Sequence, residues 1–259
     1  MISRSRERAS DAISEVTEAA SAAAGSGVVR FEECDMSDLA DVRRLGVLLA
    51  KTLGGVDALV LNAGVLLHER SITDEGLELA WATNVVGPYL LEHLMMPNLA
   101  SVKGRVVMVT SGGAYSEALA LPDADLAGEL YDGAAVYART KRAQIALAQL
   151  QTAQMAEAGV TVHAVHPGWA DTPGVQSSLP TFRKLTKPFL RSADEGADSI
   201  AWLALAAEPL ENPGQLWHDR KIRPRHKIPG KAESASARAA LDTELRRLSG
   251  MTGRQGVPG

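Results

Sequence analysis

The residues with the clearest chemistry in this chain are Tyr137 and Lys141. They stand four positions apart in the segment Tyr-Ala-Arg-Thr-Lys, and side chains at positions i and i+4 of a helix share one face. A free tyrosine has a pKa of about 10 and is a poor proton carrier at neutral pH. A cation about 4 Å from the phenol, at an effective dielectric constant near 20, contributes roughly 4 kcal/mol. Because about 1.4 kcal/mol shifts a pKa by one unit, the pair predicts a phenol that titrates close to neutral pH.

The pair alone is a weak motif, because a tyrosine and a lysine at this spacing also arise by chance. Other residues along the chain strengthen it, namely Asn62-Ala63-Gly64, Asn84, Ser111, Pro167-Gly168 and Thr172. In this order they resemble the motifs of the short-chain dehydrogenase/reductase family, and the resemblance runs from about Arg4 to Lys221. Members of that family transfer a hydride between a nicotinamide cofactor and a carbonyl or alcohol. The resemblance therefore implies an NAD(P)-dependent oxidoreductase with a small-molecule carbonyl or alcohol substrate.

Four catalytic roles follow from this resemblance. Tyr137 is the general acid/base, and Lys141 lowers its pKa and binds the hydroxyls of the nicotinamide ribose. Ser111 holds the substrate oxygen, and Asn84 supports a water in the proton relay. Each residue also has a plainer interpretation on its own: an exposed tyrosine, a solvated lysine, a turn serine and an asparagine on the wet side of a helix.

The cofactor contacts are implied in the same way, with Tyr137 and Lys141 among them. The small residues of Asn62-Ala63-Gly64 allow the backbone to approach the cofactor closely, or they form an ordinary strand-to-helix turn. Asp35 contacts the adenine or caps the following helix, and the two roles are compatible. Pro167-Gly168 and Thr172 contact the nicotinamide carboxamide, or they belong to a plain surface loop.

Arg4 stands where the family places a basic residue against the adenosine 2′-phosphate. A guanidinium suits phosphate because it can donate two parallel hydrogen bonds. Arg4 therefore favours NADP, with NAD as the alternative. An exposed arginine in a disordered start is the competing interpretation.

The elements that must position these residues are helices alternating with strands. The pattern predicts helices at 8–24, 39–53, 73 or 74 to 99, 134–158 and 193–207, and strands at 28–34, 56–61, 105–110, 161–165 and 214–221. Continuous apolar runs such as 56–61 are typical of strands buried on both faces. The alternation predicts an α/β fold, a Rossmann-like doubly wound parallel sheet.

The start of the chain departs from that fold. A dinucleotide-binding fold begins with a strand, a glycine-rich turn and a helix that hold the pyrophosphate, yet no glycine precedes Gly25. We therefore predict an N-terminally incomplete fold that lacks the first strands and the glycine-rich turn. In the family order 3-2-1-4-5-6-7 these strands are 1 and 2, at the centre of the sheet. The explanations are a start codon placed too far downstream, which we favour, a truncated chain, or direct pairing of strand 28–34 with strand 56–61.

Composition and residue spacing limit the domain organisation, the location and the other kinds of site that the chain could have. The 259 residues predict one domain over 1–229 and a polar tail over 230–259 with one helix at 234–248. The net charge of −4 and the scattered cations give no case for nucleic acid. Cys34 is the only cysteine, which excludes an internal disulfide and suits a reducing compartment. No apolar run approaches the length of a membrane span and the start lacks a secretory signal, so the predicted location is the cytoplasm. Metal-ligand spacing is lacking, and the set Ser111, His166 and Asp171 lacks the nucleophile elbow of a hydrolase.

The long separation of Ser111 from Tyr137 resembles the retinol-dehydrogenase-like branch of the family. The segments 166–175 and 217–221 resemble the group called dehydrogenase/reductase family member 12. The insertion 114–133 and the loop 173–190 would wall the substrate pocket, and their apolar residues favour a lipophilic substrate: Leu119, Leu121, Leu179, Phe182 and Phe189. By analogy, helices 74–99 and 134–158 would pair in a homodimer. The competing hypothesis is a catalytically silent fragment that acts, if at all, through association with other proteins.

Overall fold

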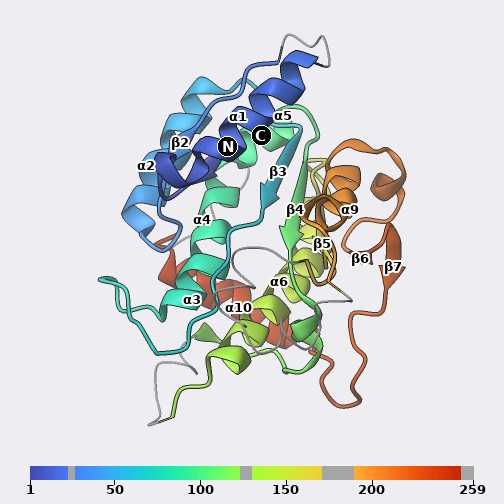
Figure 1. Ribbon diagram of the computed structural model, residues 1–259. Coiled ribbons are helices and arrows are strands. Elements are labelled where there is room, and N and C mark those ends of the chain that lie inside the picture. Colours follow the sequence, from blue (N-terminus) through green and yellow to red (C-terminus); the bar gives the residue numbers. More distant parts are fainter. Residues whose placement is uncertain (23–26, 123–129, 171–189, 252–259) are drawn as a thin grey trace.

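The computed structural model describes residues 1–22, 27–122, 130–170 and 190–251. Its strands are β1 (Ile2–Ser3), β2 (Glu32–Glu33), β3 (Ala58–Leu61), β4 (Arg105–Val109), β5 (Thr161–Val165), β6 (Leu216–His218) and β7 (Lys221–Arg223). Its α-helices are α1 (Arg6–Ala22), α2 (Leu39–Thr52), α3 (Leu79–Trp81), α4 (Gly87–Leu94), α5 (Met96–Ser101), α6 (Gly133–Met155), α9 (Ala193–Leu205) and α10 (Ala235–Leu248). A π-helix, η1 (Ala82–Val86), joins α3 to α4, and two 3₁₀ helices are η2 (Gly112–Tyr115) and η5 (Glu208–Glu211). Figure 1 shows their arrangement.

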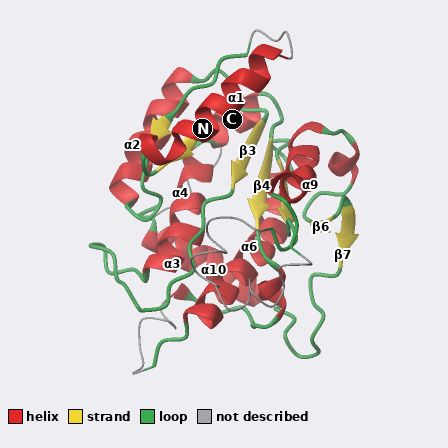
Figure 2. Ribbon diagram, viewed as in Figure 1, coloured by secondary structure: helices red, strands yellow, loops and turns green. Residues whose placement is uncertain are grey.

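The main sheet has five strands in the order β3-β4-β5-β6-β7. The first four are parallel, and Figure 2 shows the helices packed around them. Helix α9 packs on β4 and β3, and Leu203 meets Val107, Val165 and Trp217 there. The larger hydrophobic core includes residues of α2, α4, α6 and α10. This arrangement confirms the predicted α/β Rossmann-like fold.

The predicted final strand at 214–221 is instead a hairpin. β6 ends at His218, and β7 returns antiparallel from Lys221. Asp219 and Arg220 form the two-residue loop with φ of 55° and 54°. A tight hairpin loop of this length favours positive φ at both positions, and this geometry reverses the chain.

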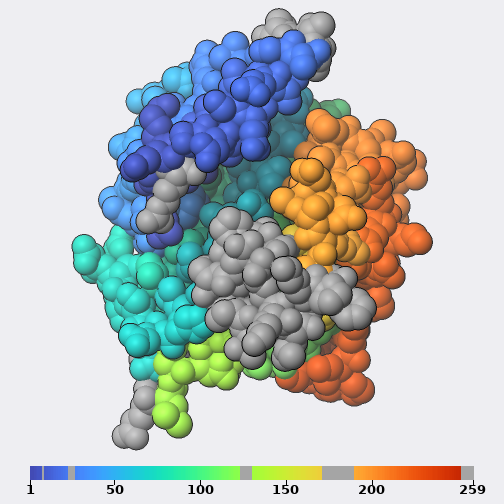
Figure 3. Space-filling view, in the orientation of Figure 1, coloured from blue at the N-terminus to red at the C-terminus, as the bar shows by residue number. Residues whose placement is uncertain are grey.

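The predicted strand at 28–34 is shortened to β2, and it pairs with β1 in a separate two-stranded parallel sheet. The amide of Glu32 donates to Met1 O, and the amide of Cys34 donates to Ser3 O. The alternative that 28–34 pairs with 56–61 is therefore wrong, because the backbone groups of 28–34 that form a ladder do so with β1. β3 stands at one edge of the main sheet, opposite β7, and Val60 is 39% exposed. Figure 3 shows the β3 region, in teal, at the surface between α1 and α9.

The single long helix predicted from 73 or 74 to 99 is divided into α3, η1, α4 and α5. It begins later than predicted, because the Glu78 side chain accepts from the amide of Trp81 and caps α3. Pro88 and Pro97 stand at the starts of α4 and α5, where the missing amide of proline is tolerated. Gly87 is required at its position, because a Cβ there would lie 2.0 Å from Met36 O. None of the described helices is both long enough and apolar enough to span a membrane.

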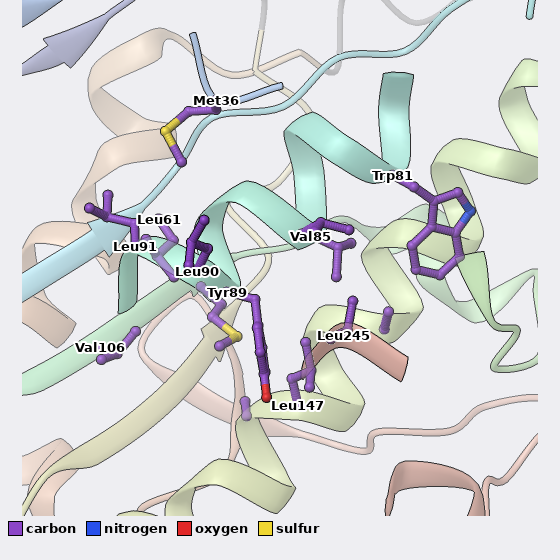
Figure 4. Close-up of a cluster of buried hydrophobic side chains, with 14 of the residues drawn as sticks. Met36, Leu61, Trp81, Val85, Tyr89, Leu90, Leu91, Val106, Leu147 and Leu245 are labelled. Atoms are coloured by element: carbon purple, nitrogen blue, oxygen red, sulfur yellow. The ribbon is translucent and has the colours of Figure 1, made fainter. Parts of the chain in front are cut away.

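The helix predicted at 234–248 is present as α10, and it packs against α6. Leu241 and Leu245 are fully buried in the main core. Figure 4 shows Leu245 in one cluster with Leu147 of α6 and Tyr89 of α4. The Tyr89 hydroxyl donates to Asp242 Oδ1 over 2.7 Å and fixes the position of α10 on α4. The division of the chain at residue 229 stays a prediction.

A buried acid lies beneath α10. Glu92 of α4 is 0% exposed, and its Oε2 accepts from Gln151 Nε2 of α6 over 3.0 Å. Its Oε1 has no hydrogen-bond partner among the described residues. Burial raises the pKa of Glu92 to about 8, the hydrogen bond from Gln151 opposes the shift, and the charge of Asp242 adds to it.

We predict that Leu245→Ala lowers the free energy of unfolding by about 2 to 5 kcal/mol, because the truncation leaves a cavity in a closed core. Leu205→Ala is the matched control, since Leu205 is 82% exposed and a surface change of this kind costs within about 0.5 kcal/mol. Urea unfolding followed by circular dichroism measures both. Equal losses in the two variants would show that α10 does not contribute to the core.

We also predict that Glu92→Gln flattens the dependence of stability on pH. The folded-state pKa of Glu92 is raised to about 8 from 4.5, so between these two values the folded state binds a proton that the unfolded state has lost. The stabilisation of the folded state by this proton is fully present below pH 4.5 and is lost as the pH rises through about 8. The slope reaches about 1.4 kcal/mol per pH unit in that window. Unfolding between pH 5 and pH 9 measures it, with the exposed Glu157→Gln as the control. A slope that Glu92→Gln leaves unchanged would contradict the prediction.

Candidate active site

The carboxyl ends of three parallel strands bring the predicted site residues to one edge of the sheet. β3 leads into Asn62-Ala63-Gly64, β4 leads into Thr110 and Ser111, and β5 leads into His166. Ligands of open α/β sheets bind at this edge. The Ser111 side chain accepts from the amide of Gly113 and starts η2.

Helix α6 carries Tyr137 and Lys141 on one face, as the spacing predicts. Asp132 caps the helix by accepting from the amides of Ala134 and Ala135. Gly133 is needed at the first position, because a Cβ there would lie 1.6 Å from Leu67 O. The helix start is therefore fixed one turn before Tyr137.

Tyr137 lies beside Ser111, close enough for the serine hydroxyl to influence the pKa of the phenol. Tyr137 is half-buried. Burial raises the pKa of its phenol above the ordinary value of 10, and the neighbouring Ser111 hydroxyl opposes that shift. The structure therefore brings together the two hydroxyls that the sequence placed in one site.

Lys141 is 3% exposed, and its Nζ donates to Val109 O over 2.9 Å. The Nζ lies 5.5 Å from the centroid of the Tyr137 ring. Burial lowers the pKa of Lys141 to about 8. Thr110 Oγ1 donates to Lys141 O over 2.7 Å, so the same residue is bonded twice to the end of β4.

The prediction that Lys141 lowers the phenol pKa to near neutrality is wrong for this structure. The pKa of Tyr137 is raised, and burial is the larger cause. The ammonium lies over the ring and is hydrogen-bonded to the Val109 carbonyl. Spacing on a helix places two side chains on one face, but it does not fix which atoms meet.

Asn84 is 0% exposed within the π-helix η1, so the interpretation as a residue on the wet side of a helix is wrong. Its Oδ1 accepts from the amide of Val65 over 2.7 Å, and its Nδ2 donates to Val65 O and to Thr140 Oγ1. Its main-chain carbonyl accepts from Gln144 Nε2. Asn84 therefore connects the loop after β3 to α6 by hydrogen bonds. The sequence alone did not reveal this role.

The loop Asn62-Ala63-Gly64 is exposed and lies directly against these groups. A Cβ on Gly64 would lie 3.2 Å from Lys141 Nζ and 3.4 Å from Asn84 Oδ1. Because Gly64 has no side chain, the Lys141 amine faces the exposed backbone of this loop directly.

Pro167 and Gly168 follow β5, and Gly168 has a φ of +84°. A Cβ on Gly168 would lie 2.8 Å from Arg191 Cδ. His166 Nδ1 accepts from the amide of Gly112, the residue after Ser111. The sequence alone assigns His166 no role in the site, and its position directly before Pro167 is the one signal that indicates it. Thr172 and Asp171 lie outside the described residues.

Arg4 follows β1, and Asp35 lies shortly after β2; these are the two strands of the smaller sheet. Arg4 is exposed. Asp35 Oδ1 accepts from the amide and the hydroxyl of Ser37, so Asp35 holds the turn before α2. The cap of α2 is Asp38, which accepts from two amides of the first turn. Among the described residues, no group of three histidines, cysteines or acids is arranged to hold a metal.

Comparison with known proteins supports the same family. The sequence profile described as enoyl-(acyl carrier protein) reductase matches residues 6–204, a range that includes Ser111, Tyr137 and Lys141. Dehydrogenase/reductase SDR family member 12 of Bos taurus is 39% identical over 66% of this chain and 54% of its own length. Retinol dehydrogenase 13 of Mus musculus is 30% identical over 89% of this chain and 71% of its own length. Polyprenol dehydrogenase of Danio rerio is 32% identical over 74% of this chain and 62% of its own length.

Solved structures agree in fold. A crystal structure of an uncharacterized protein from Mycobacterium paratuberculosis covers 96% of this chain and is itself covered to 83%, with a TM-score of 0.69 at 23% identity. At that identity the likeness shows the fold alone. The chain spans about half the length of the first relative above. The profile match over most of the chain and the relatives that share it establish that the chain belongs to the short-chain dehydrogenase/reductase family, in the branch of dehydrogenase/reductase SDR family member 12 and retinol dehydrogenase 13.

Proposed function

We propose that this chain is an NAD(P)-dependent oxidoreductase that transfers a hydride between a nicotinamide cofactor and a carbonyl or alcohol. The observation that carries the proposal is that Ser111, Tyr137 and the buried Lys141 lie together, with the Lys141 Nζ over the tyrosine ring. A buried lysine with a lowered pKa beside such a pair is typical of functional sites.

The described residues fit one end of the cofactor. Lys141 Nζ has three donors, of which one is used on Val109 O, and it faces the open backbone at Gly64. Lys141 and the loop Asn62-Ala63-Gly64 would hold the nicotinamide ribose, and Pro167-Gly168 would lie near the carboxamide. The bound cofactor supplies or accepts the hydride. The described residues include no glycine-rich strand-to-helix turn for the pyrophosphate, so the fit is to the ribose end.

The protein groups perform the proton transfer. Ser111 and Tyr137 together offer two hydroxyls to one substrate oxygen. Because the pKa of Tyr137 is raised, the phenol is protonated at neutral pH and donates its proton to the oxygen of a carbonyl that is being reduced. The ammonium of Lys141 then lies near the negative charge that forms on the phenol. Proton transfer of this kind contributes about 10²- to 10⁴-fold to a rate.

We propose a lipophilic substrate. Leu119 and Leu121 pack against the main hydrophobic core, so they do not argue for an open apolar pocket. Leu179, Phe182 and Phe189 lie outside the described residues. A lipophilic substrate is supported by two relatives, which are named for retinol and for polyprenol.

We also propose that the chain is cytoplasmic and forms a homodimer. The single cysteine, Cys34, is free and buried, which suits the reducing cytoplasm. The homodimer through 74–99 and 134–158 would have to accommodate α10, because Asp242 bonds Tyr89 and Leu241 is buried in the same core. The rival function is a silent chain that acts through association with other proteins. Cofactor binding separates the two.

We predict that Tyr137→Phe lowers the rate of NADPH consumption with a panel of aldehydes and ketones by about 10² to 10⁴, because the variant removes the proton donor. Tyr131→Phe is the matched control, since that hydroxyl bonds Glu78 away from Ser111. Equal rates for the wild type and Tyr137→Phe would overturn the proposed function.

We predict that the purified chain binds NADPH and that Arg4→Ala weakens this binding by about tenfold, or about 1.4 kcal/mol, while NADH binding is unchanged. Loss of the contact to the 2′-phosphate is the reason. Lys51→Ala is the control, because Lys51 is also exposed but lies in the last turn of α2. Fluorescence titration measures the affinities. No binding of either cofactor would favour the rival function, and an equal effect on both would remove the preference for NADP.

A further inference from the structure

A cavity of about 300 Å³ lies at the ends of β5 and β6, separate from the candidate active site around Tyr137. It is bordered by η2, by the β6–β7 hairpin and by the segment after β7. The residues that matter for its chemistry are Tyr115, His166, Leu216, His218, Arg223 and Lys227. Ser111, Tyr137 and Lys141 are not among the described residues that line it. Its volume is at the lower end for small-molecule sites, which begin at about 300 Å³.

Two cations on the wall of this cavity form no ion pair among the described residues, although the charge of Arg223 acts on Asp219. Within the described ranges, no carboxylate lies within ion-pair distance of Arg223 or Lys227, and Arg223 Nε is buried without a hydrogen-bond partner. Neighbouring arginines differ, because Arg191 is paired with Asp219 and Arg220 is paired with Asp198. Arg223 is only partly buried, so its terminal nitrogens, which are not among the buried atoms without a partner, are available to an anion in the cavity.

Two histidines add hydrogen-bonding groups. The rings of His166 and His218 are stacked, with centroids 4.8 Å apart. His166 Nδ1 accepts from the amide of Gly112, and burial lowers the pKa of His166 to about 4, so the proton of the neutral ring is on Nε2. His218 Nδ1 lies 2.9 Å from His166 O, and its Nε2 lies 3.3 Å from Asp219. Asp219, the carboxylate next to the cavity, is thus already engaged by His218 and by Arg191.

The remaining walls are apolar. The ring of Tyr115 has Lys227 Nζ 4.5 Å from its centroid, and its hydroxyl donates to Pro224 O over 2.6 Å. The Tyr115 hydroxyl is therefore occupied, and the ring presents a flat face. Leu216 is buried at the back.

We propose that this cavity binds an oxyanion, a carboxylate or a phosphate, carried by a small molecule with an aromatic or similarly flat apolar part. The guanidinium of Arg223 can donate two parallel hydrogen bonds to either anion. Lys227 adds a second positive charge, and Tyr115 with Leu216 contacts the apolar part. This site is additional to the proposed hydride transfer, and it needs no nicotinamide cofactor.

The test is isothermal titration calorimetry of the full chain, without cofactor, against phenyl phosphate, benzoate and benzyl alcohol. We expect at least one of the two anions to bind and the neutral alcohol to bind at least tenfold more weakly. The tighter of the two anions identifies the anion class. Arg223→Gln should weaken anion binding at least tenfold, and added sodium chloride should also weaken it.

Arg220→Gln is the matched control, because Arg220 stands on the same hairpin but is exposed and paired with Asp198. It should leave the affinity unchanged, as should Tyr137→Phe. Lys227→Gln, at an exposed position, serves as a second variant should Arg223→Gln lose its fold by circular dichroism, and it too should weaken binding. The proposal is overturned by any of three results: neither anion binds, benzyl alcohol binds equally, or Arg220→Gln or Tyr137→Phe weakens binding as much as Arg223→Gln. None of these results depends on whether the chain oxidises or reduces a substrate.

Discussion

The site depends on the burial of one ammonium group. Lys141 lies in the interior and donates from Nζ to Val109 O, while its own carbonyl accepts from Thr110 Oγ1. A buried charge is unfavourable without hydrogen bonds, so the residue is stable only where α6 meets the end of β4. The two bonds fix the register of α6 on that strand. The position of Tyr137 beside Ser111 follows, because Tyr137 stands one turn earlier on the same helix.

Asn84 completes this arrangement from the other side. Its side chain uses both Oδ1 and Nδ2 on Val65 and Thr140, and a buried polar group with all its bonds made specifies one geometry. The π-helix η1 places Asn84 between the loop after β3 and α6. Such single-turn π-segments occur frequently at functional sites. The open backbone at Gly64 is therefore held against Lys141 by an interaction that a local sequence pattern does not encode.

The sequence predicted the elements whose signals are local. The strand at 161–165 and the start of α2 at Leu39 agree with the structure, because apolar runs and capping residues act within a few positions. The pairing of β2 with β1 and the hairpin at Asp219 depend on long-range register or on unusual φ values in residues other than glycine. The site residues were recognisable as a set, but the phenol pKa was not, since burial and the direction of the lysine amine are tertiary properties.

The short helix η2 links Ser111 to the cavity that Arg223 and Lys227 line. Ser111 begins η2 and Tyr115 ends it, and Gly112 donates to His166 Nδ1 between them. Ser111 contacts Tyr137 at one end, whereas Tyr115 and His166 line the cavity at the other. A ligand in the cavity would contact the residues that hold η2 in place. Contacts on both sides of η2 consequently determine the position of the Ser111 hydroxyl. Arg223 lines the same cavity as Tyr115, so its positive charge lies near the segment that carries Ser111.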